Sequence, residues 1–193
     1  MNDKPLKMKK SDRTRAAIAA AAQQIFAAQG YERATIRDIA AAADIDPTMV
    51  MRYFGSKDRL FAEVAEFDLD LPDVAALDRE RIGETLVAHF LSVWEGQGGS
   101  AGGGGFPILL RSAASNDYAA ARMQQLFAAQ VLPAMLALGP PASAPQRAGL
   151  VATQMLGLAL TRYVLRLPPV VMLDRETIVR EIGATVQRYA TGA

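Results

Sequence analysis

Cysteine is absent from the chain and histidine nearly so, and both absences narrow the chemistry that is possible. The 193 residues include no cysteine and a single histidine, His89. Without thiols there is no disulfide framework, no thiolate zinc site and no cysteine nucleophile. A single imidazole also removes most metal sites and acid–base pairs. We therefore expect a protein that is not an enzyme and that holds no metal ion and no cofactor.

Long apolar runs are missing as well. No stretch reaches the roughly 18 uncharged apolar residues of a membrane span, and no apolar run follows the opening MNDKPLKMKK. The sequence therefore predicts neither a transmembrane helix nor a signal peptide, and we expect a cytoplasmic protein without a membrane partner. Hydrophobic residues nevertheless make up 51% of the chain and charged residues 21%, which is sufficient for a folded core.

Alternating runs of β-branched residues are also missing, so the sequence predicts an all-α fold. Capping residues predict the boundaries of the first four helices. The expected boundaries are Ser11 to Gln29 before Gly30, a helix capped by Thr35 with Asp38 closing a capping box, a helix from Asp46 and Pro47 to Phe54, and a helix of about residues 57–70 capped by Ser56. Two short helices joined by a tight turn after a longer one are typical of a helix-turn-helix. Such a helical unit can also have a purely structural role, in which it packs against the rest of the protein without binding DNA.

Five further helices are predicted beyond a break at Pro72. They span about residues 79–94, 106–114, 116–138, 146–167 and 174–189. Pro168 and Pro169 are expected to stop the fourth of these helices. The glycine-rich segment 96–105 predicts a flexible surface loop.

Positive charge is concentrated in the N-terminal third. Residues 1–60 carry eleven Lys/Arg and seven Asp/Glu, a net charge of +4, whereas residues 61–193 carry a net charge of −3. The cations at the start of the chain are Lys4, Lys7, Lys9, Lys10, Arg13 and Arg15. This asymmetry favours a polyanionic partner. A solvated basic tail is the alternative.

Residues 35–64, TIRDIAAAADIDPTMVMRYFGSKDRLFAEV, resemble the DNA-binding signature of the TetR family of bacterial regulators. The matching features are Thr-x-x-x-Ile-Ala, a turn, a short proline-containing helix ending in an aromatic pair, and Gly-Ser-Lys. The later segments LDLPD, LLRSAAS, QRAGLVATQMLGLALTRYVLRLPP and QRYATG are similar to one sensor-domain subgroup of that family. Met51 departs from the signature because the family places a tyrosine there, so a contact made by that tyrosine is not transferred to this chain.

The resemblance implies two domains. Residues 1–56 would form a basic arm and a three-helix helix-turn-helix DNA-binding domain, and residues 57–193 a helical effector-binding and dimerisation domain, with the helix of about 57–70 connecting them. It implies a ligand-responsive transcriptional regulator, a repressor by family default. Such a repressor binds a palindromic operator in double-stranded DNA as a homodimer, with recognition helices about 34 Å apart, and is released by a small hydrophobic effector.

Phosphate contacts are assigned by the resemblance. A DNA-binding protein needs cations and N–H groups that grip phosphates before a helix can contact the bases. In relatives these contacts come from the starts of the second and fourth helices and the end of the third, which here correspond to Thr35, Arg37, Tyr53 and Lys57. Plainer roles remain open, namely ion pairing for Arg37, packing for Tyr53 and solvation for Lys57.

The recognition helix is expected to place Thr48, Met49 and Arg52 toward the major groove. Arg52 is the only one of these able to make a bidentate contact to guanine. Met49 has the alternative of filling a gap in the core. The positions interpreted as core in this unit are Ile39, Val50 and Phe54.

The last two long helices are expected to form the homodimer interface, as the family does. The proposed interface residues are Leu150, Gln154, Gly157, Leu158, Thr161, Ile178 and Ile182. The alternative is that this apolar stripe packs only within the protomer.

A ligand pocket is expected among His89, Phe90, Val93, Trp94, Phe106, Leu110, Met123, Phe127, Met155 and Tyr163. Apolar residues at helical spacing are more often simply core.

Two other classes of function, an enzyme and a helical protein-binding adaptor, are less well supported. Asp68, Asp70 and Asp73 lack the glycine and distal glutamate of a calcium-binding loop, so capping is the simpler explanation for them. A helical adaptor that binds only protein remains as the alternative function. It predicts no salt-sensitive DNA affinity, whereas the basic residues predict a steep one.

Overall fold

The computed structural model describes residues 10–95 and 105–192, and every regular element within these ranges is helical. The predicted all-α fold is confirmed. In chain order the elements are α1 Lys10–Arg33, α2 Ile36–Ala42, α3 Pro47–Phe54, α4 Lys57–Val64, η1 Val74–Ala76, α5 Ile82–Trp94, α6 Gly105–Ser112, α7 Asp117–Leu126, η2 Phe127–Val131, α8 Leu132–Leu138, η3 Pro141–Ser143, α9 Ala144–Ala159, η4 Leu160–Val164, α10 Pro168–Val171 and α11 Arg175–Thr191. The loop predicted at 96–105 lies outside the described residues, except for Gly105, which opens α6.

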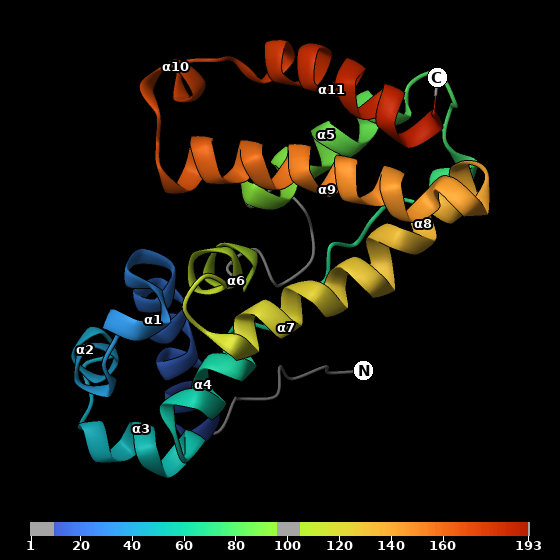
Figure 1. The fold of residues 1–193 in the computed structure, drawn as a ribbon. Coiled ribbons are helices and arrows are strands. Elements are labelled where there is room, and N and C mark those ends of the chain that lie inside the picture. The colour runs from blue at the N-terminus through green and yellow to red at the C-terminus, as the bar shows by residue number, and fades with distance from the viewer. Residues whose placement is uncertain (1–9, 96–104, 193) are drawn as a thin grey trace, which may run out of the picture.

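Helices α1–α4 gather at one end of the molecule, and α5, α8, α9 and α11 gather at the other (Figure 1). Helices α6 and α7 lie between the two groups. α6 packs against α1, and α5 packs along α11. None of the helices in the described ranges combines the length and the apolar composition of a membrane span.

Helices α2, α3 and α4 begin at the capping residues that the sequence predicted. The Thr35 hydroxyl accepts a hydrogen bond from the Asp38 N–H, and the Asp38 carboxylate accepts one from the Thr35 N–H, each at 3.1 Å. This capping box satisfies two N–H groups at the start of α2. Asp46 and Ser56 cap α3 and α4 in the predicted positions. α1 is interrupted at Gly30, which has a φ of 75°, where the sequence predicted the helix to end.

An aromatic core holds the N-terminal unit together. Phe26 of α1 and Phe61 of α4 pack edge to face, with ring centroids 5.1 Å apart. Ile39, Val50 and Phe54, which the sequence assigned to the core, are all buried. α2, α3 and α4 are therefore fixed to α1 through their apolar faces.

Helix α4 ends at Val64, so the prediction of a helix reaching about residue 70 was wrong. Residues 65–73, here called the connector, have irregular backbone. The Asp68 carboxylate accepts a hydrogen bond from the Asp70 N–H at 2.8 Å, and Asp70 has a φ of 47°. Side chains that bond to nearby backbone compete with a helix. Pro72 also disfavours helical backbone in the residue before it.

The helix predicted for residues 116–138 forms as α7, η2 and α8 in succession. η2 is a π-helical turn, closed by a hydrogen bond from the Leu132 N–H to the Phe127 carbonyl five residues earlier. We attribute the wider turn to Pro133, which has no N–H to donate and whose ring crowds the carbonyl four residues before it. The helical path therefore continues from α7 into α8 past Pro133.

Helices α5 and α11 cross at two glycines. A Cβ on Gly83 would lie 2.1 Å from the Gly183 carbonyl oxygen, and a Cβ on Gly183 would lie 3.0 Å from the Glu84 Cα. Any larger residue at Gly83 would force the helices apart. The close approach also allows the Gly83 N–H to donate to the Gln187 side-chain oxygen at 2.7 Å.

The segment around Pro168 and Pro169 differs from the prediction. The preceding helix ends at Val164, after the π-helical turn η4, and Pro168 opens the short helix α10. Proline is tolerated in the first turn of a helix because the N–H that it lacks would be unpaired there. These prolines therefore begin a helix.

Arg147 is a buried cation that joins three segments of the chain. Its side chain belongs to a residue that is 4% exposed. The guanidinium donates to the carbonyls of Ala190 at 2.6 Å, Met135 at 2.7 Å and Pro140 at 3.2 Å, and to the Ser143 hydroxyl at 3.2 Å. A cation is favoured near helix C-termini by the helix dipole. Arg147 thus fastens the ends of α8 and α11 to the start of α9.

We expect Arg147→Ala to lower the free energy of unfolding by about 3 kcal/mol, because it leaves buried carbonyls without a donor. Urea unfolding followed by circular dichroism measures this loss. Arg180→Ala is the matched control, since Arg180 is exposed and pairs only with its neighbour Glu181, and it should behave like the wild type. Equal effects of the two substitutions would contradict the role assigned to Arg147.

Candidate nucleic-acid interface and internal cavity

Helix α3 presents one face to solvent. Val50 and Phe54 anchor its other face in the core, whereas Thr48, Met51 and Arg52 are exposed. The exposed fraction of Met51 is 44%, a high value for a methionine. Met49, which was predicted to face the groove with Thr48 and Arg52, is half-buried.

Thr48 is also tied to the cap of its own helix. Its N–H and its hydroxyl both donate to the Asp46 carboxylate, at 2.7 and 2.5 Å. These hydrogen bonds, first from the hydroxyl and then from the N–H, lower the pKa of Asp46 below its usual value because they favour the charged carboxylate. The hydroxyl proton of Thr48 is therefore engaged, while its oxygen can still accept.

Arg15 locks the end of α3 to α1. Its guanidinium donates to the Tyr53 carbonyl at 3.0 Å, pairs with the Glu63 carboxylate at 2.5 Å, and lies 4.4 Å from the Phe54 ring centroid. The sequence counted Arg15 among the cations of a basic arm, but its guanidinium is already paired within the protomer, at the surface. Of the other arm cations, Lys4, Lys7 and Lys9 lie outside the described residues, and Lys10 and Arg13 are exposed.

Lys57 is the first residue of α4, and its side chain lies against Tyr31. Its ammonium lies 4.2 Å from the Tyr31 ring centroid, a cation–π contact. The Tyr31 hydroxyl donates to the Asp58 carboxylate. Burial, reinforced by that hydrogen bond, raises the pKa of Tyr31 to about 12, so the hydroxyl remains a donor at neutral pH. Lys57 is thereby held beside a helix N-terminus, which favours anions.

The other predicted phosphate contacts are distributed around α3. Thr35 and Arg37 are exposed at the start of α2. The Thr35 hydroxyl donates to the Asp38 carboxylate at 2.7 Å and accepts from the Asp38 N–H, so it can donate to a phosphate only in place of that carboxylate. Tyr53 is half-buried, and the Arg52 guanidinium lies 5.6 Å from its ring centroid. The exposed cations Arg37 and Arg52 and the half-buried Lys57 thus come from three successive helices.

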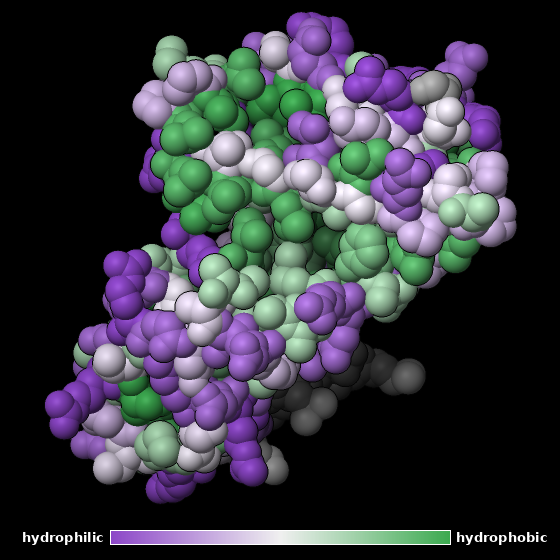
Figure 2. All heavy atoms as spheres, in the orientation of Figure 1, coloured by the Kyte–Doolittle hydropathy of each residue, from purple (hydrophilic) through white to green (hydrophobic). Residues whose placement is uncertain are grey.

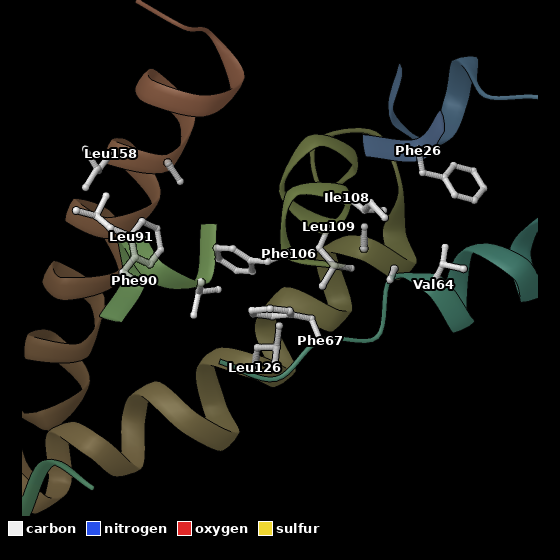
Figure 3. Close-up of a cluster of buried hydrophobic side chains, with 14 of the residues drawn as sticks. Phe26, Val64, Phe67, Phe90, Leu91, Phe106, Ile108, Leu109, Leu126 and Leu158 are labelled. Carbon is white, nitrogen blue, oxygen red and sulfur yellow. The ribbon is translucent and has the colours of Figure 1, made fainter. Parts of the chain in front are cut away.

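An apolar cavity of about 340 Å³ lies in the larger part of the molecule. Its wall includes seven residues that the sequence singled out, which are His89, Phe90, Val93, Phe106, Met123, Phe127 and Met155. The other lining residues are Leu69, Leu71, Leu86, Gln124, Leu126, Val131, Ala134, Met135, Val151, Ala152 and Leu156. No charged side chain is among these lining residues. Figure 3 shows Phe90 and Phe106 pointing toward each other across the space between α5 and α6.

Three residues predicted for a pocket do not line this cavity. Trp94 and Tyr163 stack on one another instead, with ring centroids 4.7 Å apart and ring planes within 3°. Leu110 is half-buried against the core. Sequence reasoning in turn missed Leu69 and Leu71, which lie in the connector, because an irregular segment carries no periodic signal of the face that it presents.

The predicted interface residues divide into two groups. Leu150 is 40% exposed, and no atom lies within 4 Å of a Cβ built on Gly157. Gln154, Thr161 and Ile182 are half-buried. Leu158 and Ile178, at 6% and 1% exposure, belong to the core of the protomer, so their assignment to an interface was wrong. Helical spacing alone does not distinguish an internal face from an external one.

Apolar side chains continue the exposed face of α9 toward α10. Figure 2 shows this apolar surface at the end of the molecule where α10 lies. Its exposed members are Leu160, Leu165, Leu167, Val171, Met172 and Leu173.

These features define a class of protein, in which a helix-turn-helix unit with an exposed third helix is joined to a helical domain that contains a partly open apolar cavity. Two family models match the chain. Residues 18–64 match the bacterial regulatory proteins of the tetR family, and residues 80–190 match the tetracyclin repressor-like C-terminal domain. The chain belongs to the TetR family of transcriptional regulators, which bind DNA.

Individual relatives agree with this membership. TcmR of Streptomyces glaucescens, an HTH-type transcriptional regulator, is 35% identical over 83 residues, which are 43% of this chain and 36% of TcmR. The alignment thus spans about a third of that relative. A TetR-family regulator of Streptomyces coelicolor A3 is 27% identical, with a TM-score of 0.59 over 96% of this chain and 99% of its own.

Another solved structure resembles the chain in fold. NalD of Pseudomonas aeruginosa, described as the secondary repressor of the MexAB-OprM multidrug efflux pump, is 20% identical. Its TM-score is 0.63 over 93% of this chain and 97% of its own.

Arg15→Ala should weaken DNA binding without changing its salt dependence, because Arg15 positions α3 through the Tyr53 carbonyl and α4 through Glu63. A lost phosphate contact would instead reduce the log–log salt slope by about 0.9 per site. Fluorescence anisotropy across a salt series measures both quantities. Arg79→Ala, which removes an exposed cation in the turn before α5, controls for net charge. A reduced slope for Arg15→Ala would make Arg15 a phosphate contact.

Proposed function

We propose that this protein is a repressor that binds a palindromic operator as a homodimer and releases it when a small apolar molecule fills the cavity. The observation that carries the DNA-binding part is the exposed face of α3, with Arg52 on it and Arg37 and Lys57 on the flanking helices. A helix of this kind enters the major groove while neighbouring cations hold phosphates on either side.

The individual roles remain those expected from the sequence. Thr35, Arg37, Tyr53 and Lys57 contact phosphates in this proposal. The bases are contacted by Thr48, Met49 and Arg52. Because Met49 is half-buried and the Thr48 hydroxyl proton is engaged by Asp46, Arg52 carries most of the sequence preference.

The proposal of a homodimer is supported by the exposed face of α9. Leu150 and Leu160 are 40% and 41% exposed, and Gly157 between them would let a second backbone approach closely. Gln154 and Thr161 recur at the same helical spacing and are half-buried. Exposed apolar surface of this kind marks an interaction site more often than a free surface.

The proposal of effector release is supported by the position of the cavity. α6 contributes Phe106 to the cavity wall, and at its other end the Ser112 hydroxyl accepts a hydrogen bond from the Tyr31 N–H of α1 at 3.1 Å. The connector contributes Leu69 and Leu71 to the wall and follows α4 directly. A ligand that changes either segment therefore acts on the N-terminal unit. Binding that favours one arrangement of that unit is what release requires.

Lys57→Ala and Arg52→Ala should impair DNA binding in different ways. Lys57→Ala removes one phosphate contact per protomer, so binding to operator and scrambled duplexes should weaken alike, with the salt slope reduced by about two per dimer. Arg52→Ala should cost about 1–3 kcal/mol per half-site and relax the preference at one base pair. Anisotropy titrations on both duplexes decide between these outcomes, with Arg79→Ala as the control.

The same titrations test the alternative function. A protein-binding adaptor would bind neither duplex with a steep salt dependence. An Arg52 variant that loses both duplexes equally would place Arg52 on the phosphates, and an unchanged slope for the Lys57 variant would remove Lys57 from the interface.

Gly157→Glu should convert a dimer to a monomer, because it buries an unpaired charge where two copies of α9 meet. Sedimentation velocity at micromolar concentration measures the change. No residue in the described ranges crowds this position, so circular dichroism should remain that of the wild type. Ala75→Glu, at an exposed site on η1, is the control. A monomeric wild type, or a variant that dimerises unchanged, would contradict the interface.

A further inference from the structure

The wall of the cavity is almost entirely apolar, and its two polar side chains limit the ligands that the cavity can bind. Of its 18 lining residues, only His89 and Gln124 have polar side chains. Gln124 is exposed, whereas His89 is half-buried on α5. His89 is therefore the polar group that lies deeper in the wall.

One hydrogen bond fixes the ring of His89. Its Nε2 lies 2.8 Å from the Leu69 carbonyl oxygen. A carbonyl only accepts, so Nε2 must carry the proton and donate. In the neutral imidazole this leaves Nδ1 without a proton and able only to accept.

No described residue donates to Nδ1. Nor is Nδ1 closed off, because the one buried side-chain nitrogen or oxygen without a partner among residues 10–95 and 105–192 is Trp94 Nε1. Nδ1 is therefore an accessible acceptor, and it belongs to a residue that lines the cavity.

A second contact holds the same peptide of the connector. The Gln130 side-chain oxygen accepts a hydrogen bond from the Leu69 N–H at 3.0 Å. Leu69 is thus held through its N–H by η2 and through its carbonyl by α5. The His89 ring has a fixed partner on one side, so its orientation does not depend on the ligand.

We infer that the ligand of this cavity is a neutral, largely apolar molecule with one hydrogen-bond donor, such as a phenolic or alcoholic hydroxyl, which donates to Nδ1 of His89. The inference rests on the proposed effector site and adds the chemistry of its ligand. An anion is disfavoured because the wall holds no cation to compensate for its lost hydration. A volume of about 340 Å³ lies at the lower end of the usual range for small-molecule pockets.

Three probes of similar shape test this assignment, namely 2-naphthol, 2-methylnaphthalene and 2-naphthoate. Isothermal titration calorimetry on the full chain without DNA measures their affinities. The wild type should bind 2-naphthol roughly fivefold more tightly than 2-methylnaphthalene, the advantage of one net hydrogen bond. It should bind 2-naphthoate at least about tenfold more weakly than 2-naphthol.

His89→Leu should remove the preference for 2-naphthol and leave 2-methylnaphthalene within about twofold of its wild-type affinity. Gln130→Met is the matched control, because it removes the other bond to Leu69 and leaves the acceptor in place, so the preference should survive. Circular dichroism checks that each variant is folded, and His89→Phe is the second variant if His89→Leu is not.

Several results would overturn the inference. These are equal affinities of the wild type for the two neutral probes, tightest binding of 2-naphthoate, and a preference that persists in both His89→Leu and His89→Phe. Loss of the preference in Gln124→Leu alone would assign the hydroxyl to Gln124. If no neutral probe binds, the effector site itself is wrong. If 2-naphthol binds as expected but does not release operator DNA, the ligand chemistry stands and the proposed release fails.

Discussion

The arrangement of the molecule depends on the burial of α6 between two apolar regions. Ile108 and Leu109 are fully buried, and Figure 3 shows Ile108 on the side of Phe26 and Phe106 on the side of Phe90. One helix of eight residues therefore packs on the DNA-binding unit with one part of its surface and closes the cavity with another. Because packed interiors do not yield continuously, a displacement of α6 at the cavity also displaces its contact with α1.

The apolar cavity interrupts the packing of the larger domain, and the structure contains strong contacts around it. The lining side chains lack the dispersion contacts that a filled core would supply. The close crossing of α5 and α11 at Gly83 and Gly183, and the bonds from Arg147 to the ends of α8 and α11, hold the helices on either side of the space. Because Met135 lines the cavity, the bond from Arg147 also ties one residue of the wall to the start of α9 and the end of α11.

The sequence predicted well what depends on local chemistry. Thr35, Asp46 and Ser56 were identified as caps because a side chain that accepts from the next turn is a local requirement. It predicted poorly what depends on distant segments. Arg15 meets Tyr53 and Glu63 only after α1 packs against α3 and α4, and the connector contributes Leu69 to the cavity without any periodic pattern. Leu158 was misassigned because the spacing that buries it inside the protomer is the spacing expected of an external stripe.

The energy needed for effector release is small compared with the contacts available. A ligand shifts an equilibrium only by its difference in affinity for the two states. A hundredfold change in operator affinity corresponds to about 2.7 kcal/mol. At about 25 cal/mol per Å² this is the burial of about 110 Å² of apolar surface, comparable to one leucine or phenylalanine side chain. Leu69, Leu71 and Phe106 lie where the cavity wall meets the two segments that lead to the N-terminal unit. A change in the burial of one of them between the two states is therefore sufficient, and no large rearrangement of the helices is required.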